Sequence, residues 1–533
     1  MARELKAIVV GGGIADLTSA ASLVQAGWQT TVLERAPAFG EIGAGLAITR
    51  NGMAALEAIG LDEAVRSVGY ETLTAGFQDP SGRWLFRIPD NRADVRWTTT
   101  IWGVHRQRLH AAPRVAAEGA GGAGRVGRAG GAEPGGAARA GGAQSEGAEL
   151  VTGAKVTSVR PGAAGGEPAT VTWRTDAGER TSDSDLVVAA DGVRSTVRAQ
   201  LFAAARPRYS GRASWRAVIP YVGAYDGLVE LWGPGAEFGA LRVSRTELYW
   251  FGYFRHPEGQ SFDDELAAAR SHFSGWSPQV RATLEATQPS QLMRHDVYHL
   301  PGGLPTYIRG RVVLVGDAAH AALPTMGQEA ASSLEDGVRR MIAEPVTAGG
   351  DLTSALAAFD QARGPRCRRI ARQSATIARF GPDLGGGWRQ SLRNRLLRVV
   401  PAGAVVTAGA QLVRWTPPAG GAPRPTAPRR GGGRTDLVIQ LMTFQLRPGW
   451  RTSSASGHRG GRMAPLRPLL PTPAPEQARP QVSNLDPQVD APLLALAQVA
   501  AGSGFEAAEA GVDHPDGPVS DLPAEQRAVE IPQ

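Results

Sequence analysis

The stretch VVGGGIADLTSA, residues 9–20, decides the fold, because it joins a short β-rich run to a segment with helical periodicity. Gly11 and Gly13 occupy the first two glycine positions of a G-x-G-x-x-G turn. Gly11 permits the tight turn, and Gly13 lets the backbone and the helix N-terminus approach a pyrophosphate. A second β-rich run ends in Glu34, at the spacing where an acid accepts hydrogen bonds from ribose hydroxyls. The stretch therefore predicts a Rossmann-like βαβ unit that binds a dinucleotide.

Asp16 stands in the third glycine position of this turn. A glycine there allows the helix to pack closely on the strand, whereas an aspartate side chain needs room. Its charge would also compete with a pyrophosphate for the N–H donors of the first helical turn. An aspartate is nevertheless favoured in the first turn of a helix, so the two requirements conflict. We expect Asp16 to weaken binding of the cofactor.

The composition is that of a large protein with poorly folding parts. The chain has 533 residues, of which 68 are Gly and 38 are Pro, and only 42% are hydrophobic. A single cysteine, Cys367, excludes an intramolecular disulfide and fits a reducing, cytoplasmic location. We expect no signal peptide and, because no apolar run would span a membrane, no membrane partner. The net charge of +7 comes almost wholly from arginine, which indicates a G+C-rich gene, so we expect no nucleic-acid partner.

Two later motifs follow apolar runs. DLVVAADGVRSTVR, residues 185–198, contains Asp191-Gly192, and VVLVGDAAHAALPTMGQ, residues 312–328, contains Gly316-Asp317. Either Asp-Gly or Gly-Asp pair alone is usually only a turn. In this order, and after the βαβ unit, they resemble the single-component FAD-dependent monooxygenases of the salicylate and para-hydroxybenzoate hydroxylase type. The resemblance spans roughly residues 5–415.

The resemblance implies a set of FAD-binding residues. In it, Glu34 and Arg35 would hold the AMP end, Arg106 would lie at the pyrophosphate side of the flavin, and Asp317 would bind the ribityl chain. Asp191 would serve both FAD and the nicotinamide cofactor. The full set comprises Gly11, Gly13, Glu34, Arg35, Arg106, Asp191, Asp317, Pro324 and Gly327, with Pro324 and Gly327 bordering the isoalloxazine ring.

The reaction implied by the resemblance is hydroxylation of a phenolic or polycyclic aromatic molecule. NADH or NADPH would reduce the flavin, and O2 would then form a flavin C4a-hydroperoxide. Because the cofactor carries this chemistry, no catalytic side chain is assigned and no metal is expected. A monomer or a homodimer is expected. Flavin-dependent halogenases share the fold but would need a suitably placed lysine, and the only lysines, Lys6 and Lys155, do not fit.

Candidates for the substrate site are few. Trp215 and Arg216 match a Trp-Arg pair of the family's substrate domain, although a strand-packing role fits them equally. His320 lies within the third cofactor motif, and we expect it to be structural. His295 and His299 lie near the substrate domain and are more often ordinary surface or core residues.

Further departures from the family support an alternative hypothesis. Glu329 replaces the last glycine of the family's Gly-Gln-Gly, and a carboxylate beside a flavin that becomes anionic would disfavour its reduction. Residues 116–143 contain 21 Ala or Gly out of 28, too few apolar side chains to offset the entropy of ordering. Together with Asp16, these departures permit a degenerate, poorly flavinated and non-catalytic relative.

The predicted fold is α/β, with a Rossmann-like, glutathione-reductase-like FAD-binding domain. An interleaved, mostly antiparallel β-sheet domain would bind the substrate. The segments are FAD binding at 1–112, 148–205 and 301–375, substrate binding at 206–300, C-terminal helices at 376–415, and disordered stretches at 113–147 and 416–533. A natural insertion or a restored shift of reading frame would explain residues 113–147.

Overall fold

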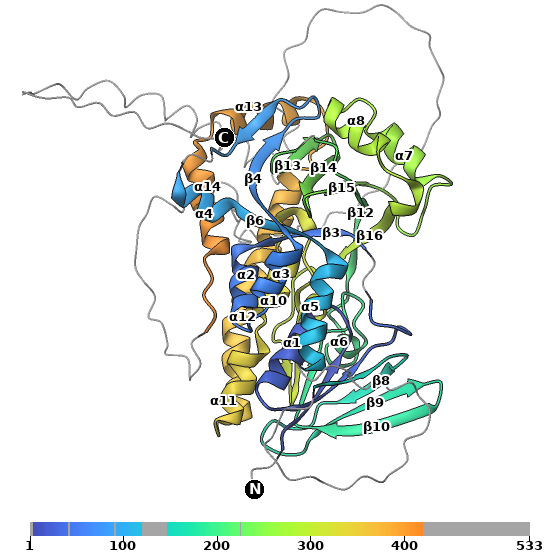
Figure 1. Ribbon diagram of the computed structural model, residues 1–533, viewed down its shortest axis with the longest axis vertical. Coiled ribbons are helices and arrows are strands. Elements are labelled where there is room, and N and C mark those ends of the chain that lie inside the picture. The colour runs from blue at the N-terminus through green and yellow to red at the C-terminus, as the bar shows by residue number, and fades with distance from the viewer. Residues whose placement is uncertain (1–3, 41–42, 90–91, 120–146, 224, 419–533) are drawn as a thin grey trace, which may run out of the picture.

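The computed structural model describes residues 4–40, 43–89, 92–119, 147–223 and 225–418. They form two sheet-based parts joined by long helices, with the first sheet at the lower end and the largest sheet at the upper end (Figure 1). The predicted fold class is confirmed. The tail from residue 419 and the stretch 120–146 lie outside the described residues.

The first sheet has six strands and brings the three predicted cofactor segments together. Its strand order is β17 (Ile308–Arg309), β18 (Val312–Leu314), β11 (Leu186–Ala189), β1 (Lys6–Val10), β2 (Gln29–Leu33) and β7 (Glu149–Val151). All neighbours are parallel except the β17–β18 pair. Continuous apolar runs such as those of β1 and β11 are typical of parallel strands that are buried on both faces.

Helix α1 (Ile14–Gln25) connects β1 to β2 as the opening stretch predicts. Its apolar positions are buried, and Gly27 adopts a positive φ of 82° after the helix ends. Helix α5 (Arg106–Glu118) packs on α1. It extends to Glu118, so the folded domain continues past the predicted boundary at residue 112. The described chain resumes at residue 147, and the N–H of Ala148 donates to the carbonyl of Ala117 at 2.7 Å.

The largest sheet has nine strands and lies at the other end of the molecule. The path is β16 (Met293–His299), β12 (Arg208–Pro220), β15 (Glu247–Arg255), β14 (Ala236–Arg242), β13 (Leu228–Gly233), β4 (Tyr70–Gln78), β6 (Thr100–His105) and β3 (Gly45–Thr49), with β5 (Trp84–Arg87) beside β4. Four of these strands come from residues 45–105, which the sequence assigned wholly to the cofactor domain. The difference arises from long-range pairing, since β4 pairs in parallel with β13.

A small antiparallel sheet flanks the first one. It consists of β8 (Lys155–Arg160), β9 (Ala169–Thr175) and β10 (Gly178–Ser184). The other helices are α2 (Arg50–Glu57), α3 (Asp62–Val68), α4 (Ala93–Thr99), α6 (Thr196–Leu201), α7 (Glu265–His272), α8 (Pro278–Glu285), α9 (Asp317–His320), α10 (Glu329–Glu335), α11 (Glu344–Thr347), α12 (Leu352–Phe380), α13 (Trp388–Val399) and α14 (Ala402–Val413).

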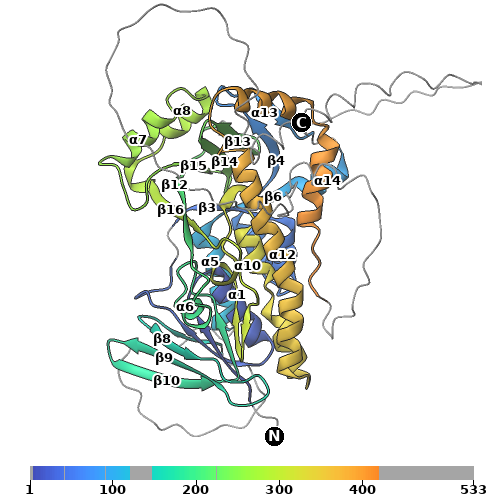
Figure 2. The ribbon, with the colours of Figure 1, turned by 180° about the vertical axis from the view of Figure 1, so that it is seen from behind.

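Helix α12 runs along the molecule between its two ends (Figure 2). Beyond its C-terminal end, the carbonyl of Pro382 accepts a hydrogen bond from Arg212 of β12 at 3.0 Å. Helices α7 and α8 cover the outer face of the large sheet, where Trp215, Phe238 and Trp250 form a buried aromatic core. The inner face of that sheet is therefore the face directed at the cofactor segments. None of the described helices combines the length and apolar character needed to cross a membrane.

Candidate functional site

The glycine turn has the geometry that the motif requires. Gly11 adopts a φ of 118°, and its N–H donates to the carbonyl of Leu33 at 2.9 Å. A Cβ atom at Gly11 would overlap the side chain of Asp16, so only glycine fits there. His110 of α5 contacts the same turn through a 2.6 Å hydrogen bond between Nε2 and the carbonyl of Gly12. The sequence analysis did not identify His110, because only tertiary packing brings α5 to the turn.

Asp16 folds back onto the turn. Its Oδ2 accepts the Gly13 N–H at 2.8 Å, and only 3% of the residue is exposed. Its Oδ1 makes no hydrogen bond to any described residue. Burial raises the pKa of the Asp16 carboxyl well above its usual range, and Glu34 and Asp191 raise it further. The carboxyl therefore occupies an N–H group that the motif offers to a pyrophosphate.

Glu34 lies beside the turn at the end of β2. Its Oε1 accepts the Ala36 N–H at 2.6 Å, and a Cβ atom at Gly12 would lie 2.7 Å from its Oε2. The absence of a side chain at Gly12 thus leaves the close approach that a ribose-binding acid needs. Arg35 is exposed.

The second and third motifs meet through Arg198, which is 1% exposed. Arg198 Nη1 donates to the carbonyls of Asp317 at 3.4 Å and Ala318 at 2.9 Å. Asp191 itself caps α6, accepting the N–H groups of Thr196 at 2.6 Å and Val197 at 3.1 Å. Its position in the structure thus shows a role in shaping its own loop.

Asp317 is exposed at the start of α9, unlike Asp16. The preceding Gly316 adopts a positive φ of 57°, and a Cβ atom there would lie 3.0 Å from the Cβ of Ala15. The turn at Gly316 therefore packs against the first turn of α1. Pro324 begins a short 3-10 helix, and Gly327 ends it in the left-handed conformation. All three motifs converge where the strands β1, β11 and β18 end.

Glu329, the first residue of α10, lies between the meeting point of the three motifs and the large sheet. Burial and Asp317 raise the pKa of the Glu329 carboxyl to about 7, while Arg216 and Arg106 oppose that rise. Burial also raises the pKa of Tyr249, on which Arg216, Glu329 and Arg106 all act. The structure therefore gathers two arginines, a carboxyl and a phenol from four separate segments.

Strand alternation separates the two substrate-site candidates on β12. Trp215 points outward, donates from Nε1 to Glu265 at 2.7 Å, and stacks on Phe254 with ring centroids 3.7 Å apart. It is fully buried in the core under α7, so the pocket role is wrong for Trp215 and strand packing is its role. Arg216 points to the inner face.

Arg216 belongs to a cross-strand row on the inner face of the large sheet. Residues directly opposite on neighbouring strands share a face. Through these pairs, Glu230 of β13 is followed by Gly239, Phe251, Arg216 and Met293. A Cβ atom at Gly239 would overlap the Phe251 ring, so that ring lies over the glycine. Arg216, Phe251 and Met293 remain partly accessible and form one wall of a candidate substrate site.

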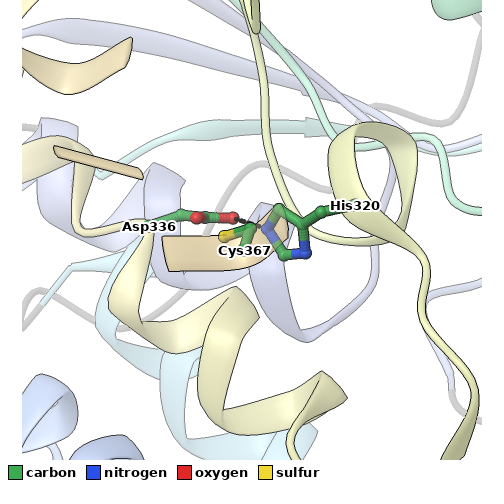
Figure 3. A group of neighbouring side chains, drawn as sticks. All are labelled: His320, Asp336 and Cys367. Atoms are coloured by element: carbon green, nitrogen blue, oxygen red, sulfur yellow. Dashed lines mark hydrogen bonds and ion pairs between the residues drawn. The ribbon is translucent and has the colours of Figure 1, made fainter. Parts of the chain in front are cut away.

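The three histidines occupy different places. His295 lies opposite Ser214 on the inner face, and burial, with Arg216, Arg106 and Arg294, lowers its pKa. His299 lies opposite Arg208 at the far end of β16, and burial lowers its pKa also. His320 is buried against Asp336 and Cys367 (Figure 3).

A larger cavity of about 680 Å³ lies at the outer side of the large sheet. Its walls include Trp84, Tyr225 and Gln279, and none of the predicted site residues contributes to it. The cofactor and substrate candidates therefore belong to the inner face and not to this cavity.

Comparison with known proteins supports the FAD assignment. A family profile described as an FAD binding domain matches residues 140–374, and one described as an FAD dependent oxidoreductase matches residues 6–235. The chain is 31% identical to the aurachin C monooxygenase/isomerase of Stigmatella aurantiaca, covering 78% of this chain and 100% of that protein. It is 28% identical to the 2-heptyl-3-hydroxy-4(1H)-quinolone synthase of Pseudomonas aeruginosa, over 74% and 94%.

The fold resembles solved structures as well. The structure of Klebsiella pneumoniae HpxO complexed with FAD and uric acid matches with a TM-score of 0.64 and 22% identity. The match covers 77% of this chain and 96% of that one. At this identity the likeness concerns the fold alone.

Proposed function

Because the chain belongs to the FAD-dependent aromatic monooxygenases, we propose that it hydroxylates a small aromatic molecule with O2 and NADH or NADPH. The observation that carries the proposal is the convergence of three motifs, distant in sequence, at one edge of the first sheet. Arg198 joins two of them directly, and the turn at Gly316 packs on the helix that begins the first.

FAD would be held by residues of these three motifs. Gly11 and Gly13 form the turn that would face its pyrophosphate, although the Asp16 carboxyl accepts the Gly13 N–H. Glu34 would accept hydrogen bonds from the ribose, and Asp317 is exposed for the ribityl chain. Arg106 contributes positive charge between the turn and the large sheet. When bound, FAD supplies the activation of O2 after its reduction by a nicotinamide cofactor.

The substrate would lie between this cofactor site and the inner face of the large sheet. Arg216 would orient an oxygen-bearing ring, since a guanidinium binds planar oxyanions well. Phe251 and Met293 would pack on the ring and exclude water. Several relatives are named for nitrogen heterocycles that carry oxygen, among them a quinolone, 6-hydroxynicotinate and urate. We therefore favour an oxygenated nitrogen heteroaromatic compound as substrate.

The alternative, a poorly flavinated and non-catalytic relative, is not favoured. The similar proteins named above are enzymes, and the glycine turn keeps the positive φ and the close approach of Glu34 that the motif needs.

The proposal is tested by flavin binding and by oxygen labelling. Purified protein is titrated with FAD, and Glu34→Ala should weaken binding by about 1.5–3 kcal/mol through loss of a charged acceptor. Glu57→Ala, an exposed acid on α2, serves as the matched control and should bind as the wild type does.

With FAD bound, an oxygenated nitrogen heterocycle should accelerate oxidation of NADH or NADPH. One 18O atom from labelled O2 should enter the product. Failure to retain flavin in excess FAD would refute the cofactor assignment. Label arriving from water, or oxidation of the nicotinamide without oxygen uptake, would refute the monooxygenase reaction.

A further inference from the structure

A small cavity lies between α10 and α12, directly behind the loop that leads from α9 to α10. Its volume is about 10 Å³, roughly the space that one water molecule needs. Glu329, Ser332 and Ser374 contribute to its walls, together with His320 and Cys367. The cavity is therefore both polar and of the right size for an ordered water.

Two hydroxyl groups at this cavity have no hydrogen-bond partner among the described residues. The Oγ atoms of Ser332 on α10 and Ser374 on α12 are buried and make no hydrogen bond to any residue in the described part of the chain. The residues are 3% and 1% exposed. Because a buried hydroxyl without a partner is costly, a water between these helices would satisfy both.

Glu329 separates the cavity from the candidate cofactor face. Three charged groups act on its carboxyl from that face, Asp317 of α9, Arg216 of β12 and Arg106 of α5. Glu329 in turn acts on the Tyr249 phenol of β15. With its pKa at about 7, the carboxyl changes its protonation state near neutral pH.

His320, which contributes to the cavity wall, pairs with Asp336 (Figure 3). His320 Nε2 lies 2.9 Å from Asp336 Oδ2. Burial lowers the pKa of His320, but Cys367 and Asp336 outweigh it, and the pKa lies well above its usual value. The pair can therefore hold a proton within the protein.

A metal ion is a poor occupant for this group, although ligand atoms of His320, Asp336 and Cys367 lie within 4.8 Å of one another. Asp336 Oδ1 accepts from Arg363 Nε at 2.9 Å, and Oδ2 accepts the Gly316 N–H at 2.7 Å. Arg363 already supplies the positive charge that the carboxylate needs. The group is better suited to proton storage.

We propose that Glu329 is a proton-exchanging residue of the candidate active site, and that one water held by Ser332 and Ser374 links its carboxyl to His320. In this exchange the His320 imidazolium gives a proton to the water, and the water gives one to the Glu329 carboxylate. No electron moves, and the reverse transfer restores the starting state. The use of this proton at the cofactor face rests on the proposed function, whereas the exchange itself does not.

The first experiment uses the protein without FAD or substrate. Burial also raises the pKa of Glu230, on β13, to about 7, so infrared difference spectra across a pH titration should show two buried carboxyls that titrate near pH 7. Glu329→Gln should remove one of the two components, and Glu57→Gln, at an exposed site, should leave both. If Glu230→Gln abolishes the whole signal, or if Glu329→Gln leaves it unchanged, the assignment of Glu329 is wrong.

The second experiment tests the water link with hydroxyl deletions. Ser332→Ala and Ser374→Ala should each shift the midpoint of the Glu329 titration by about half a pH unit or more, since each removes a ligand of the water. Ser333→Ala is the matched control on the same helix, because that hydroxyl already donates to the Glu329 carbonyl at 2.9 Å. An unchanged midpoint in both test variants would overturn the link.

A third measurement connects the exchange to the cofactor. In FAD-loaded protein, the midpoint potential of the flavin should depend on pH near 7 in the wild type, and this dependence should weaken in Glu329→Gln. If FAD does not bind, the proposed function fails while the infrared result stands. If FAD binds but the two proteins show the same pH dependence, Glu329 does not serve the cofactor face.

Discussion

Asp16 and Glu329 both stand where the family resemblance expects glycine, yet the protein accommodates them differently. Asp16 is almost fully buried and satisfies the turn's own Gly13 N–H. Glu329 stays partly accessible, although protein surrounds it, and it faces arginines that come from β12 and α5. The charged form of an acid in a cofactor site can thus be stabilised by the local backbone or by charges from a distant segment.

The two acids share one property that the sequence did not reveal. Burial raises the pKa of both carboxyls, that of Glu329 to about 7. The expectation that Glu329 would act as a full negative charge beside the flavin therefore applies only above that pH. Below it, the neutral form imposes a much smaller electrostatic penalty.

In the comparison of Asp16 with Glu329, the largest expected effect is on the free energy of unfolding of Glu329→Gln. The raised pKa means that the folded state keeps a proton that the unfolded chain releases at lower pH. The contribution of Glu329 to the free energy of unfolding is therefore highest below its unfolded-state pKa and is lost as pH rises through about 7. Glu329→Gln should be more stable than the wild type at pH 8 by up to about 3 kcal/mol, and nearly equal to it at pH 4. Urea unfolding at both pH values measures the difference, and an equal difference at the two would contradict it.

Asp16→Gly should tighten FAD binding by about tenfold or more, which corresponds to about 1.4 kcal/mol. The change frees the Gly13 N–H and removes both the bulk and the charge of the side chain. Flavin titration at low and high salt separates the two contributions, because salt screens only the charge. If Asp16→Gly binds FAD no better at either salt concentration, the turn tolerates its aspartate.

Arg216→Met should raise the pKa of Glu329 by about half a unit to one unit, because it removes an opposing positive charge. The infrared titration described above measures this shift. Arg206→Met, on an exposed part of the chain, should leave the pKa unchanged. A fall in the Glu329 pKa would mean that Arg216 does not stabilise its carboxylate form.

The smallest effect isolates the charge of Asp16. Asp16→Asn keeps nearly the same shape and should improve FAD affinity by about threefold at neutral pH, or about 0.6 kcal/mol. Since the bound pyrophosphate favours the protonated carboxyl, wild-type affinity should also fall as pH rises. Asp16→Asn should lose that pH dependence. An identical pH dependence in both proteins would assign it to another group.

Local patterns were enough to predict the cofactor domain. The turn at Gly11, the acid at Glu34 and the strand before Asp317 depend on residues close in sequence, and the six-stranded sheet confirms the predicted fold. The substrate wall could not be predicted in the same way. Whether Trp215 or Arg216 faces the site depends on which side of β12 is covered by α7 and α8, and only tertiary packing decides this.

The hydrogen bond between Ala117 and Ala148 has a consequence for chain topology. It fixes the two sides of the connection at 120–146 next to each other, so the length of that connection does not determine the packing of α5. Replacing it with a few flexible residues should lower the entropic cost of closing the loop by about 1–2 kcal/mol. The same adjacency makes Glu118 and Gly147 suitable new termini for a circularly permuted protein.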